Sequence, residues 1–285
     1  MEIVHSIQRM QALARKLRQE GRKVAFVPTM GYLHDGHLSL VRRAKQVAEI
    51  VVVSIFVNPT QFGPTEDFSH YPRDLVRDLD MLKDLQVDYV FTPEADEVYP
   101  EKFDTKITLP RLSSTMCGAS RPGHFDGVSV IVLKLFNIVL PDFAIFGQKD
   151  YQQALIIRTM VRDLNIPVEI IVGPIVRESD GLALSSRNTF LSDAERKAAL
   201  VLSKSLFHAE KLIMEGERSV EKIKEDMKEL FEKEPLVKID YIDLVDPEDL
   251  APLKRLNSDT LIAVAAHVGK TRLIDNVLVQ TGGES

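Results

Sequence analysis

The fold is decided by the segment KVAFVPTMGYLHDGHLSLVRRAKQVA, residues 23–48. An apolar run at 24–27, ended by Pro28, predicts a strand, and apolar residues at helical spacing over 38–48 predict a helix. The tetrad from His34 to His37 lies between them, where unpaired backbone N–H groups and the helix dipole favour phosphate. Two imidazoles on one helical face can donate to one phosphate, and Gly36 lets an adenine ring approach the backbone. We therefore predict a nucleotide triphosphate site; a solvated loop and a pair of metal ligands are the alternatives.

Strands and helices alternate through the first part of the chain. Strand-like runs occur at residues 24–27, 50–57, 87–91, 143–146 and 168–172, and helical patterns at 38–48, 75–85, 128–139 and 152–164. This alternation is typical of βα units and a parallel sheet. Right-handed crossovers place loops at the carboxyl ends of the strands, where open α/β sheets bind ligands.

The pattern changes after about Arg177, where charged helices are expected at 193–215 and 220–231 and strands at 238–245, 261–268 and 273–279. We predict an α/β fold with a Rossmann-like parallel sheet and helices on both faces at residues 1–176. A smaller C-terminal α+β lid domain is expected at 177–285. The stretch from Ser179 to Asn188 is the expected hinge, with a ligand crevice between the two parts.

Composition argues against several classes of protein. The 285 residues are 45% hydrophobic and 27% charged, enough for a sizeable core and against disorder. A net charge of -6 and the absence of a lysine or arginine run argue against a nucleic-acid partner. No apolar stretch approaches the ~20 residues that cross a bilayer, and the first residues lack a secretory signal, so we expect a cytoplasmic protein with no membrane partner. Cys117 is the only cysteine, which excludes an intrachain disulfide and a thiolate zinc cluster.

Three further segments carry polar chemistry. Asn58 and Gln61 follow a predicted strand and can fix the hydroxyl and carboxylate of a small substrate. The alternative is that this segment is an ordinary turn with no binding role. Lys149 follows another strand end and can neutralise phosphate, although such a lysine can simply be solvated. The run LSSRN at 184–188 can close over a departing diphosphate, although serine loops are common on surfaces.

Several familiar motifs are absent from the sequence. It contains no P-loop, no G-x-G-x-x-G, no H-E-x-x-H and no G-x-S-x-G. These absences remove the main support for P-loop, dinucleotide-binding, zinc-protease and serine-hydrolase functions. A nucleotide site with a carboxylate or phosphate co-substrate remains.

Six motifs in register resemble the pantothenate synthetase family. They are MGYLHDGH (30–37), FVNPTQF (56–62), YPR (71–73), RPGHF (121–125), FGQKD (146–150) and LSSRN (184–188). More broadly, H-x-G-H followed by a basic serine loop resembles the nucleotidyltransferase superfamily. The resemblance implies an AMP-forming acid–amino-acid ligase that condenses pantoate with β-alanine through a pantoyl adenylate, consuming ATP. It also implies Mg²⁺ on the triphosphate, no tightly bound organic cofactor, and a homodimer.

The resemblance also implies roles for individual residues. His37, His34, Lys149, Ser185, Ser186 and Arg187 would be catalytic, with His37 as the proton donor. ATP would contact Pro28, Met30, Gly31, Tyr32, Leu33, His34, Asp35, Gly36, His37, Gly147, Gln148, Lys149, Asp150, Val176, Leu184, Ser185, Ser186 and Arg187. Gln61 would bind pantoate and β-alanine, Gln153 would bind pantoate, and Asn58 and Tyr71 would also contact substrate.

The acidic residues depart from the family pattern. Where neighbouring acids are expected near the metal, this chain has Arg77 followed by Asp78, so Asp78 is the one candidate Mg²⁺ ligand. Asp74, Asp78 and Asp80 also fit a solvated helix face, which is the preferred interpretation for Asp74 and Asp80. His124 is expected to shape a loop beside the site.

Two other functions remain open at this stage. Another H-x-G-H adenylyltransferase would act on a phosphorylated acceptor. A nucleotide-sensing or scaffold protein would bind ATP without turnover.

Overall fold

The computed structural model describes residues 1–64 and 66–280 and contains two compact units. The first comprises residues 1–114, 121–148 and 153–174. The second comprises residues 115–120, 149–152 and the chain from Ile175 onward. Lys149, which follows a strand of the first unit, therefore belongs to the second.

The first unit is built on a six-stranded parallel sheet with the order β1-β4-β3-β2-β5-β6. All of its strand pairs are parallel. The strands are β1 (Glu2–Val4), β2 (Val24–Thr29), β3 (Ile50–Ile55), β4 (Tyr89–Phe91), β5 (Phe143–Gly147) and β6 (Glu169–Gly173). From β2 the chain steps to β3 and β4 on one side, and then to β5 and β6 on the other. The order therefore reverses between β2 and β5, and the carboxyl ends of these two strands are where such a sheet binds ligands.

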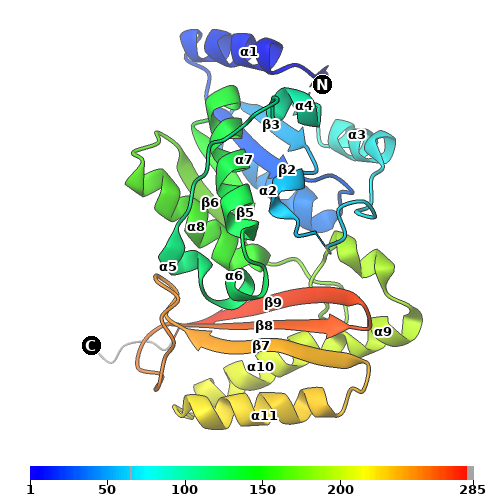
Figure 1. The fold of residues 1–285 in the computed structure, drawn as a ribbon, viewed down its shortest axis with the longest axis vertical. Coiled ribbons are helices and arrows are strands. Elements are labelled where there is room, and N and C mark those ends of the chain that lie inside the picture. Colours follow the sequence, from blue (N-terminus) through cyan, green and yellow to red (C-terminus); the bar gives the residue numbers. More distant parts are fainter. Residues whose placement is uncertain (65, 281–285) are drawn as a thin grey trace. The chain divides into compact units, whose positions relative to one another are not determined.

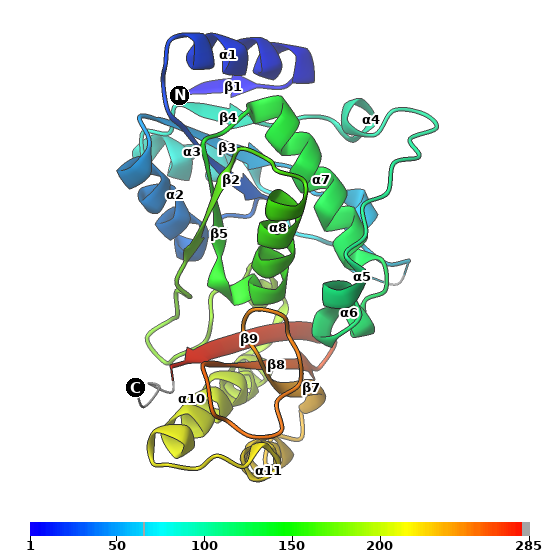
Figure 2. The same cartoon turned by 90° about the vertical axis from the view of Figure 1, so that its left-hand side faces the viewer.

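Helices cover both faces of this sheet, as predicted (Figure 2). Alternate strand residues point to opposite faces. Phe26 and Val52 belong to the core that contains residues of α1 (Ile7–Gln19), α7 (His124–Val139) and α8 (Tyr151–Asp163). Val27 and Val53 belong to the core under α2 (Asp35–Val47) and α3 (Leu75–Asp84). Short helical turns complete the unit: η1 (Pro59–Gln61), α4 (Ala95–Val98) and α5 (Pro110–Ser113).

Two predicted boundaries in this unit are wrong for identifiable reasons. The strand does not end at Pro28 but continues to Thr29. β2 pairs with β5 only at Ala25 and Phe26, so Pro28 lies beyond that ladder and needs no N–H toward β5. Helix α2 begins at Asp35, three residues before the first apolar position, because its first turn is the polar tetrad itself.

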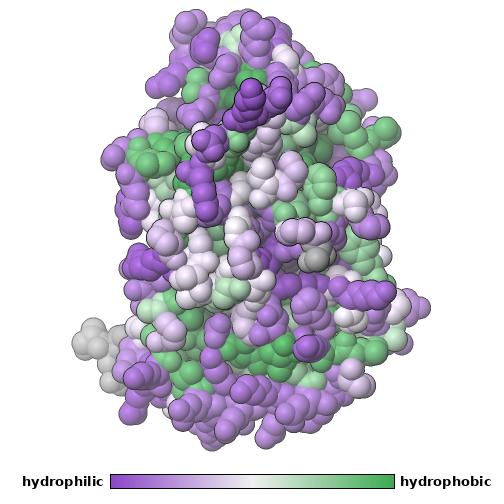
Figure 3. All heavy atoms as spheres, in the orientation of Figure 1, coloured by the Kyte–Doolittle hydropathy of each residue, from purple (hydrophilic) through white to green (hydrophobic). Residues whose placement is uncertain are grey.

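The second unit packs helices on a three-stranded antiparallel sheet (Figure 1). Its strands are β7 (Val237–Val245), β8 (Thr260–Val268) and β9 (Thr271–Val279), in the order β7-β8-β9. The helices are α6 (Met116–Ser120), α9 (Asp193–Ala198), α10 (Leu200–Met214) and α11 (Val220–Glu232), and the turn η3 (Ser186–Phe190) precedes α9. The turn η2 (Gln148–Asp150) begins in the first unit and contributes Lys149 and Asp150 to the second. Buried Leu206, Met227 and Val264 join α10 and α11 to the sheet. The visible surface of α11 is hydrophilic (Figure 3), as its charged sequence indicates.

The single helix predicted over 193–215 is divided into α9 and α10. The Leu202 N–H bonds to the Ala199 carbonyl, three residues back, so the turn between the helices is tighter than an α-turn. Within residues 1–64 and 66–280, no helix is long and apolar enough to cross a membrane.

Candidate active site

The loop between β2 and α2 brings the two predicted histidines together. His34 is the N-cap of α2, and His37 is the third residue of the helix. His34 Nδ1 accepts a hydrogen bond from the Gly36 N–H at 3.2 Å, and His37 Nδ1 accepts one from the His34 N–H at 3.3 Å. The two ring centroids lie 4.1 Å apart. The motif is a capping box in which histidines replace the usual hydroxyl and carboxyl residues.

These bonds set the tautomer of both rings. A neutral imidazole has one N–H and one acceptor nitrogen. Because Nδ1 of each ring accepts a backbone hydrogen bond, the ring hydrogen lies on Nε2. If Nδ1 of either ring carried a hydrogen, that N–H would face the backbone N–H that now donates to it, and the capping hydrogen bond would be lost. A neutral ring held in this way carries its one N–H on Nε2, and such a group can donate to a phosphate oxygen.

The helix start differs from the prediction in one respect. The sequence predicts unpaired backbone N–H groups there, but the His34 ring takes the Gly36 N–H. The prediction is wrong for this group because the motif caps its own helix. The Gly36 N–H is therefore not available to an anion in this conformation, whereas the helix dipole still favours one.

The residues before His34 adopt an unusual backbone conformation. Gly31 and Tyr32 both lie in the left-handed region, with φ of 80° and 50°. A Cβ on Gly31 would lie 2.9 Å from Ile55 Cγ2, so the position requires glycine. The N–H groups of Tyr32 and Leu33 donate to Asp78, each at 2.7 Å and each to a different carboxylate oxygen.

Asp78 is buried in this arrangement. Its side chain is 1% exposed. Burial raises the pKa of the Asp78 carboxyl above its ordinary value, opposed by the hydrogen bonds from Leu33 and Tyr32. Among the residues that the structure describes, no group of three or more His, Cys, Asp and Glu side chains could hold a metal ion. Asp78 is therefore not part of such a group.

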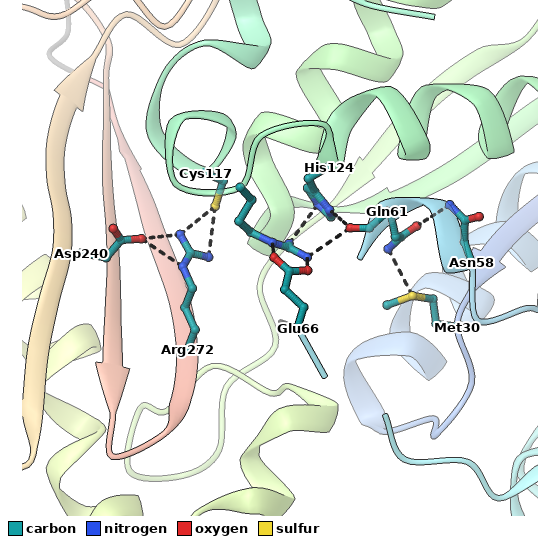
Figure 4. Close-up of polar contacts among 9 residues, drawn as sticks. Met30, Asn58, Gln61, Glu66, Cys117, His124, Asp240 and Arg272 are labelled. Carbon is teal, nitrogen blue, oxygen red and sulfur yellow. Dashed lines mark hydrogen bonds and ion pairs between the residues drawn. The ribbon is translucent and has the colours of Figure 1, made fainter. Parts of the chain in front are cut away.

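Asn58 and Gln61 form a second polar group, in and before the turn η1. Asn58 Nδ2 donates to Gln61 Oε1 at 3.0 Å, which leaves Gln61 Nε2 directed at Met30 Sδ, 3.2 Å away (Figure 4). A thioether is a weak acceptor. Asn58 is 1% exposed, and its Oδ1 accepts from the Tyr99 hydroxyl at 2.7 Å. In this structure Asn58 therefore orients Gln61, while the Gln61 amide can exchange a weak partner for a stronger one.

The backbone of Gln61 is also held in place. His124 Nδ1 lies 2.8 Å from the Gln61 carbonyl (Figure 4). Arg121 Nη1 lies 3.1 Å from His124 Nε2. Arg121 also makes two hydrogen bonds to Glu66, at 2.7 and 2.6 Å. Burial would raise the pKa of the Glu66 carboxyl, but the hydrogen bond and charge of Arg121 hold it below its ordinary value. His124 and Arg121 thus support the turn, in agreement with the loop role predicted for His124.

In the second unit, β9 contacts the segment that contains Lys149. Asn276 Nδ2 donates to the Lys149 carbonyl at 3.0 Å. The neighbouring Asp275 is 3% exposed and accepts two hydrogen bonds from Arg177, at 2.6 and 3.0 Å. Sequence reasoning missed Asp275 and Asn276; two adjacent polar residues inside an apolar strand pattern were the available signal.

The predicted diphosphate loop forms the turn η3. Ser185 is its N-cap and accepts a hydrogen bond from the Arg187 N–H at 3.3 Å. Ser186 is 7% exposed, and its carbonyl accepts from the Thr189 hydroxyl. The Leu184 N–H donates a hydrogen bond to the Val176 carbonyl at 3.0 Å. The turn is therefore an ordered element of the second unit.

The other predicted residues are placed as follows. Gly147 ends β5, Gln148 and Asp150 lie in η2, and Gln153 lies half-buried in the first turn of α8. Tyr71 is 6% exposed and packs edge-on against Phe62. Gln153 and Tyr71 belong to the first unit with His34 and His37, whereas Asp150, Val176 and Leu184 belong to the second.

Cys117 lies in a polar cluster of the second unit. Its Sγ lies 3.3 Å from the Tyr241 hydroxyl. The same Sγ lies 3.4 Å from Arg272 Nη2, and Arg272 also binds Asp240 at 2.7 Å (Figure 4). Burial raises the pKa of the Tyr241 hydroxyl well above its ordinary value. The cluster joins α6 to β7 and β9 and is a structural feature of this unit.

An open parallel sheet that reverses its strand order between β2 and β5, with a His-x-Gly-His helix start after β2, defines the α/β nucleotide-binding class of folds. Within that class, residues 2–278 match the family described as pantoate-beta-alanine ligase. The chain belongs to this family.

Individual relatives are similar to this chain in sequence over their full lengths. The chain is 55% identical over 279 residues to the pantothenate synthetase of Thermosipho africanus, covering 98% of this chain and 100% of that protein. It is 54% identical over 280 residues to that of Caldicellulosiruptor saccharolyticus, with coverage of 98% and 100%.

Solved structures of similar proteins share this fold over nearly the whole chain. The pantothenate synthetase of Thermus thermophilus has a TM-score of 0.93 at 45% identity, covering 97% of this chain and 99% of that one. The pantoate-beta-alanine ligase of Francisella tularensis, complexed with beta-gamma ATP and beta-alanine, has a TM-score of 0.81 at 35% identity, covering 98% and 97%.

Proposed function

We propose that this protein condenses pantoate with β-alanine to give pantothenate, at the expense of ATP cleavage to AMP and diphosphate. One observation carries the proposal: a pair of histidines with set tautomers begins α2 in a chain that matches the pantoate-beta-alanine ligase family over residues 2–278. The complex of the Francisella relative with an ATP compound and beta-alanine supports these two substrates.

The proposed reaction has two steps. A pantoate carboxylate oxygen attacks the α-phosphorus of ATP, the bond to the bridging oxygen of diphosphate breaks, and pantoyl adenylate forms. The amine of β-alanine then attacks the acyl carbon, the acyl C–O bond to AMP breaks, and the amine loses its proton to the solvent as the amide forms and AMP leaves. Adenylation is needed because a free carboxylate has no adequate leaving group. In such a reaction the protein contributes positioning and charge stabilisation.

The two histidines act on the phosphates in this proposal. Their Nε2–H groups would donate hydrogen bonds to phosphate oxygens as negative charge grows. The family resemblance gives His37 as a proton donor; as a neutral ring whose Nδ1 accepts the His34 N–H, it would donate a hydrogen bond and keep its proton. The capping bonds support this role because they hold both donors in one tautomer without reorganisation during the reaction. The rest of the tetrad and its flanks, Pro28, Met30, Gly31, Tyr32, Leu33, Asp35 and Gly36, would surround the nucleotide.

We assign phosphate binding in the second unit to Lys149, Ser185, Ser186 and Arg187, with Asp150, Val176 and Leu184 beside them. Gly147 and Gln148, at the end of β5, complete the proposed ATP contacts. The hydrogen bond from Asn276 to the Lys149 carbonyl supports a fixed position for that lysine backbone.

Pantoate is proposed to bind through Gln61 and Gln153, with Gln61 also near β-alanine and Tyr71 beside them. The weak thioether partner of the Gln61 amide supports this assignment, because a carboxylate or hydroxyl oxygen is a better acceptor than sulfur. Asn58 would orient the Gln61 amide through its hydrogen bond and is also proposed to contact the substrate.

Three further features complete the proposal. Mg²⁺ would arrive on the triphosphate of ATP, since hard oxygen ligands suit it and it retains water readily; no step is assigned to it. A homodimer and a cytoplasmic location are proposed from the family resemblance and are tested by sedimentation and by cell fractionation.

Omission of each substrate in turn tests the proposed function. AMP release should require ATP, pantoate and β-alanine together, because AMP leaves only when the amine attacks the adenylate. Exchange of labelled diphosphate into ATP should require pantoate but not β-alanine. Exchange that depends on a phosphorylated acceptor would favour the adenylyltransferase alternative, and ATP binding with no AMP formed would favour a sensor.

A further inference from the structure

We propose that Asp78 is a positioning residue that anchors the loop Gly31–Leu33 and thereby holds the His34–His37 pair, and that it is not a magnesium ligand. The proposal rests on the proposed function for the catalytic role of the two histidines. The anchoring itself rests on contacts within the first unit.

The carboxylate of Asp78 fills a cradle made of backbone N–H groups. Oδ2 accepts from Tyr32 and Oδ1 from Leu33, each at 2.7 Å. Successive N–H groups that converge in this way form a concavity of the kind that binds phosphate or other anions in many proteins. Here the protein supplies the anion from α3. These two N–H groups are therefore not available to an ATP phosphate while Asp78 is in place.

The anchored loop is strained. Tyr32 has a φ of 50°, in a region that non-glycine residues rarely adopt, and such a conformation persists only where its surroundings hold it. Side chains of three residues contact it. Asp78 binds two N–H groups, Thr29 Oγ1 accepts the Gly31 N–H at 3.2 Å, and the Arg77 guanidinium lies 5.1 Å from the centre of the Tyr32 ring.

The anchor connects directly to the histidine pair. Leu33 precedes His34, whose N–H donates to His37 Nδ1 and whose ring caps α2. A loop that left the left-handed conformation would turn the His34 peptide and separate the 3.3 Å capping contact. Displacement at Tyr32 and Leu33 would therefore reach both imidazoles without any direct contact between Asp78 and a ligand.

The surroundings of Asp78 also disfavour a metal role. The carboxylate is 1% exposed, and a Cβ on Gly31 would lie 3.1 Å from Oδ2, so that oxygen is covered by the loop. The guanidinium of Arg77 lies beside the same carboxylate, with Nη1 4.0 Å from Oδ1. A buried carboxylate is stable only where donors surround it. Metal binding would require Asp78 to give up the two short backbone hydrogen bonds that hold it in place.

The test compares Asp78→Asn with Asp80→Asn. Both remove one negative charge from α3, but Asp80 is exposed and outside the cradle. The asparagine amide keeps one oxygen that can accept from one of the two backbone N–H groups. Its NH₂ group would face the other backbone N–H, so that hydrogen bond is lost. We expect D78N to lower kcat for diphosphate–ATP exchange at least tenfold with the half-saturating Mg²⁺ concentration unchanged. D80N should leave both values within twofold of wild type.

Two results would overturn the proposal. One is a large rise in the half-saturating Mg²⁺ concentration in D78N, with kcat recovered at high Mg²⁺, as a metal ligand predicts. The other is a D78N enzyme indistinguishable from D80N.

A measurement on the wild-type protein keeps the proposal testable if D78N does not fold or the proposed function fails. Backbone amide exchange at Tyr32 and Leu33 should be slow without ligand and should stay slow with Mg²⁺ and ATP. Fast exchange in the free protein, or exchange that accelerates when Mg²⁺ and ATP are added, would contradict the anchor. This readout does not depend on which substrate the enzyme activates.

Discussion

His37 has two separable tasks, and a pair of substitutions distinguishes them. Its Nδ1 accepts the His34 N–H in the cap of α2, and its Nε2–H is proposed to donate to phosphate. Glutamine at the third helical position also accepts from the N-cap N–H in the usual capping box. His37→Gln therefore keeps the cap and removes the imidazole, whereas His37→Ala removes both.

The two tasks have different magnitudes. The capping contact is 3.3 Å long and part-buried, so its loss in H37A should cost about 1 kcal/mol of unfolding free energy, or roughly 2–4 °C in Tm. H37Q should unfold within about 1 °C of wild type, since its cap remains. Loss of a phosphate donor should lower the adenylation rate on the order of a hundredfold in both variants, about 2.7 kcal/mol of transition-state stabilisation.

The assays are thermal unfolding and pantoate-dependent exchange of labelled diphosphate into ATP. His70→Gln is the matched control, because His70 is an exposed histidine of the same unit, and it should change neither value. Equal Tm values for H37A and H37Q would show that the cap contributes nothing. An H37Q enzyme with wild-type exchange would refute the catalytic role.

Three further predictions concern other residues. Lys149→Ala should lower the exchange rate at least a hundredfold with little change in Tm, while Lys270→Ala, an exposed lysine of the same unit, should not; equal rates would exclude the assigned charge role. Gln61→Ala should raise the KM for pantoate with the KM for ATP unchanged, and an unaltered pantoate dependence would remove Gln61 from that site. Glu66→Gln should reduce stability at pH 7, because Arg121 lowers the pKa of Glu66 and so favours its charged form. That stabilisation is complete above the ordinary pKa of 4.5 and is lost as pH falls through the lower folded pKa, so the Tm difference from wild type should vanish in acid; a difference that is constant with pH would contradict it.

Most of the fold follows from local patterns in the sequence. The strands at 50–55 and 143–147 are apolar runs buried on both faces, which identifies a parallel sheet without knowledge of its partners. β1 and α1 were not predicted; a three-residue strand such as Glu2–Val4 has too few residues to show a period. The strand order, with its reversal between β2 and β5, is set by pairing between distant segments and has no local signal.

The site could be predicted in part, for a similar reason. The histidine tetrad is contiguous, so its place at a helix start could be read directly. Asp78 lies 45 positions from Leu33 along the chain, and the N–H groups that it binds have no side-chain signature. The sequence therefore marked Asp78 as a carboxylate near the site but could not distinguish a metal ligand from a backbone anchor. Tautomers depend on bonds from the His34 and Gly36 backbone, which appear only once the helix start is built.

The most direct test of the central claim is the fate of a carboxylate oxygen of pantoate. With pantoate labelled by ¹⁸O in its carboxylate, the enzyme should release AMP that carries one ¹⁸O atom, because the adenylate joins that oxygen to the α-phosphorus and the amine then breaks the acyl bond. Unlabelled AMP, formed together with pantothenate, would contradict an adenylate intermediate and the role given to the histidine pair.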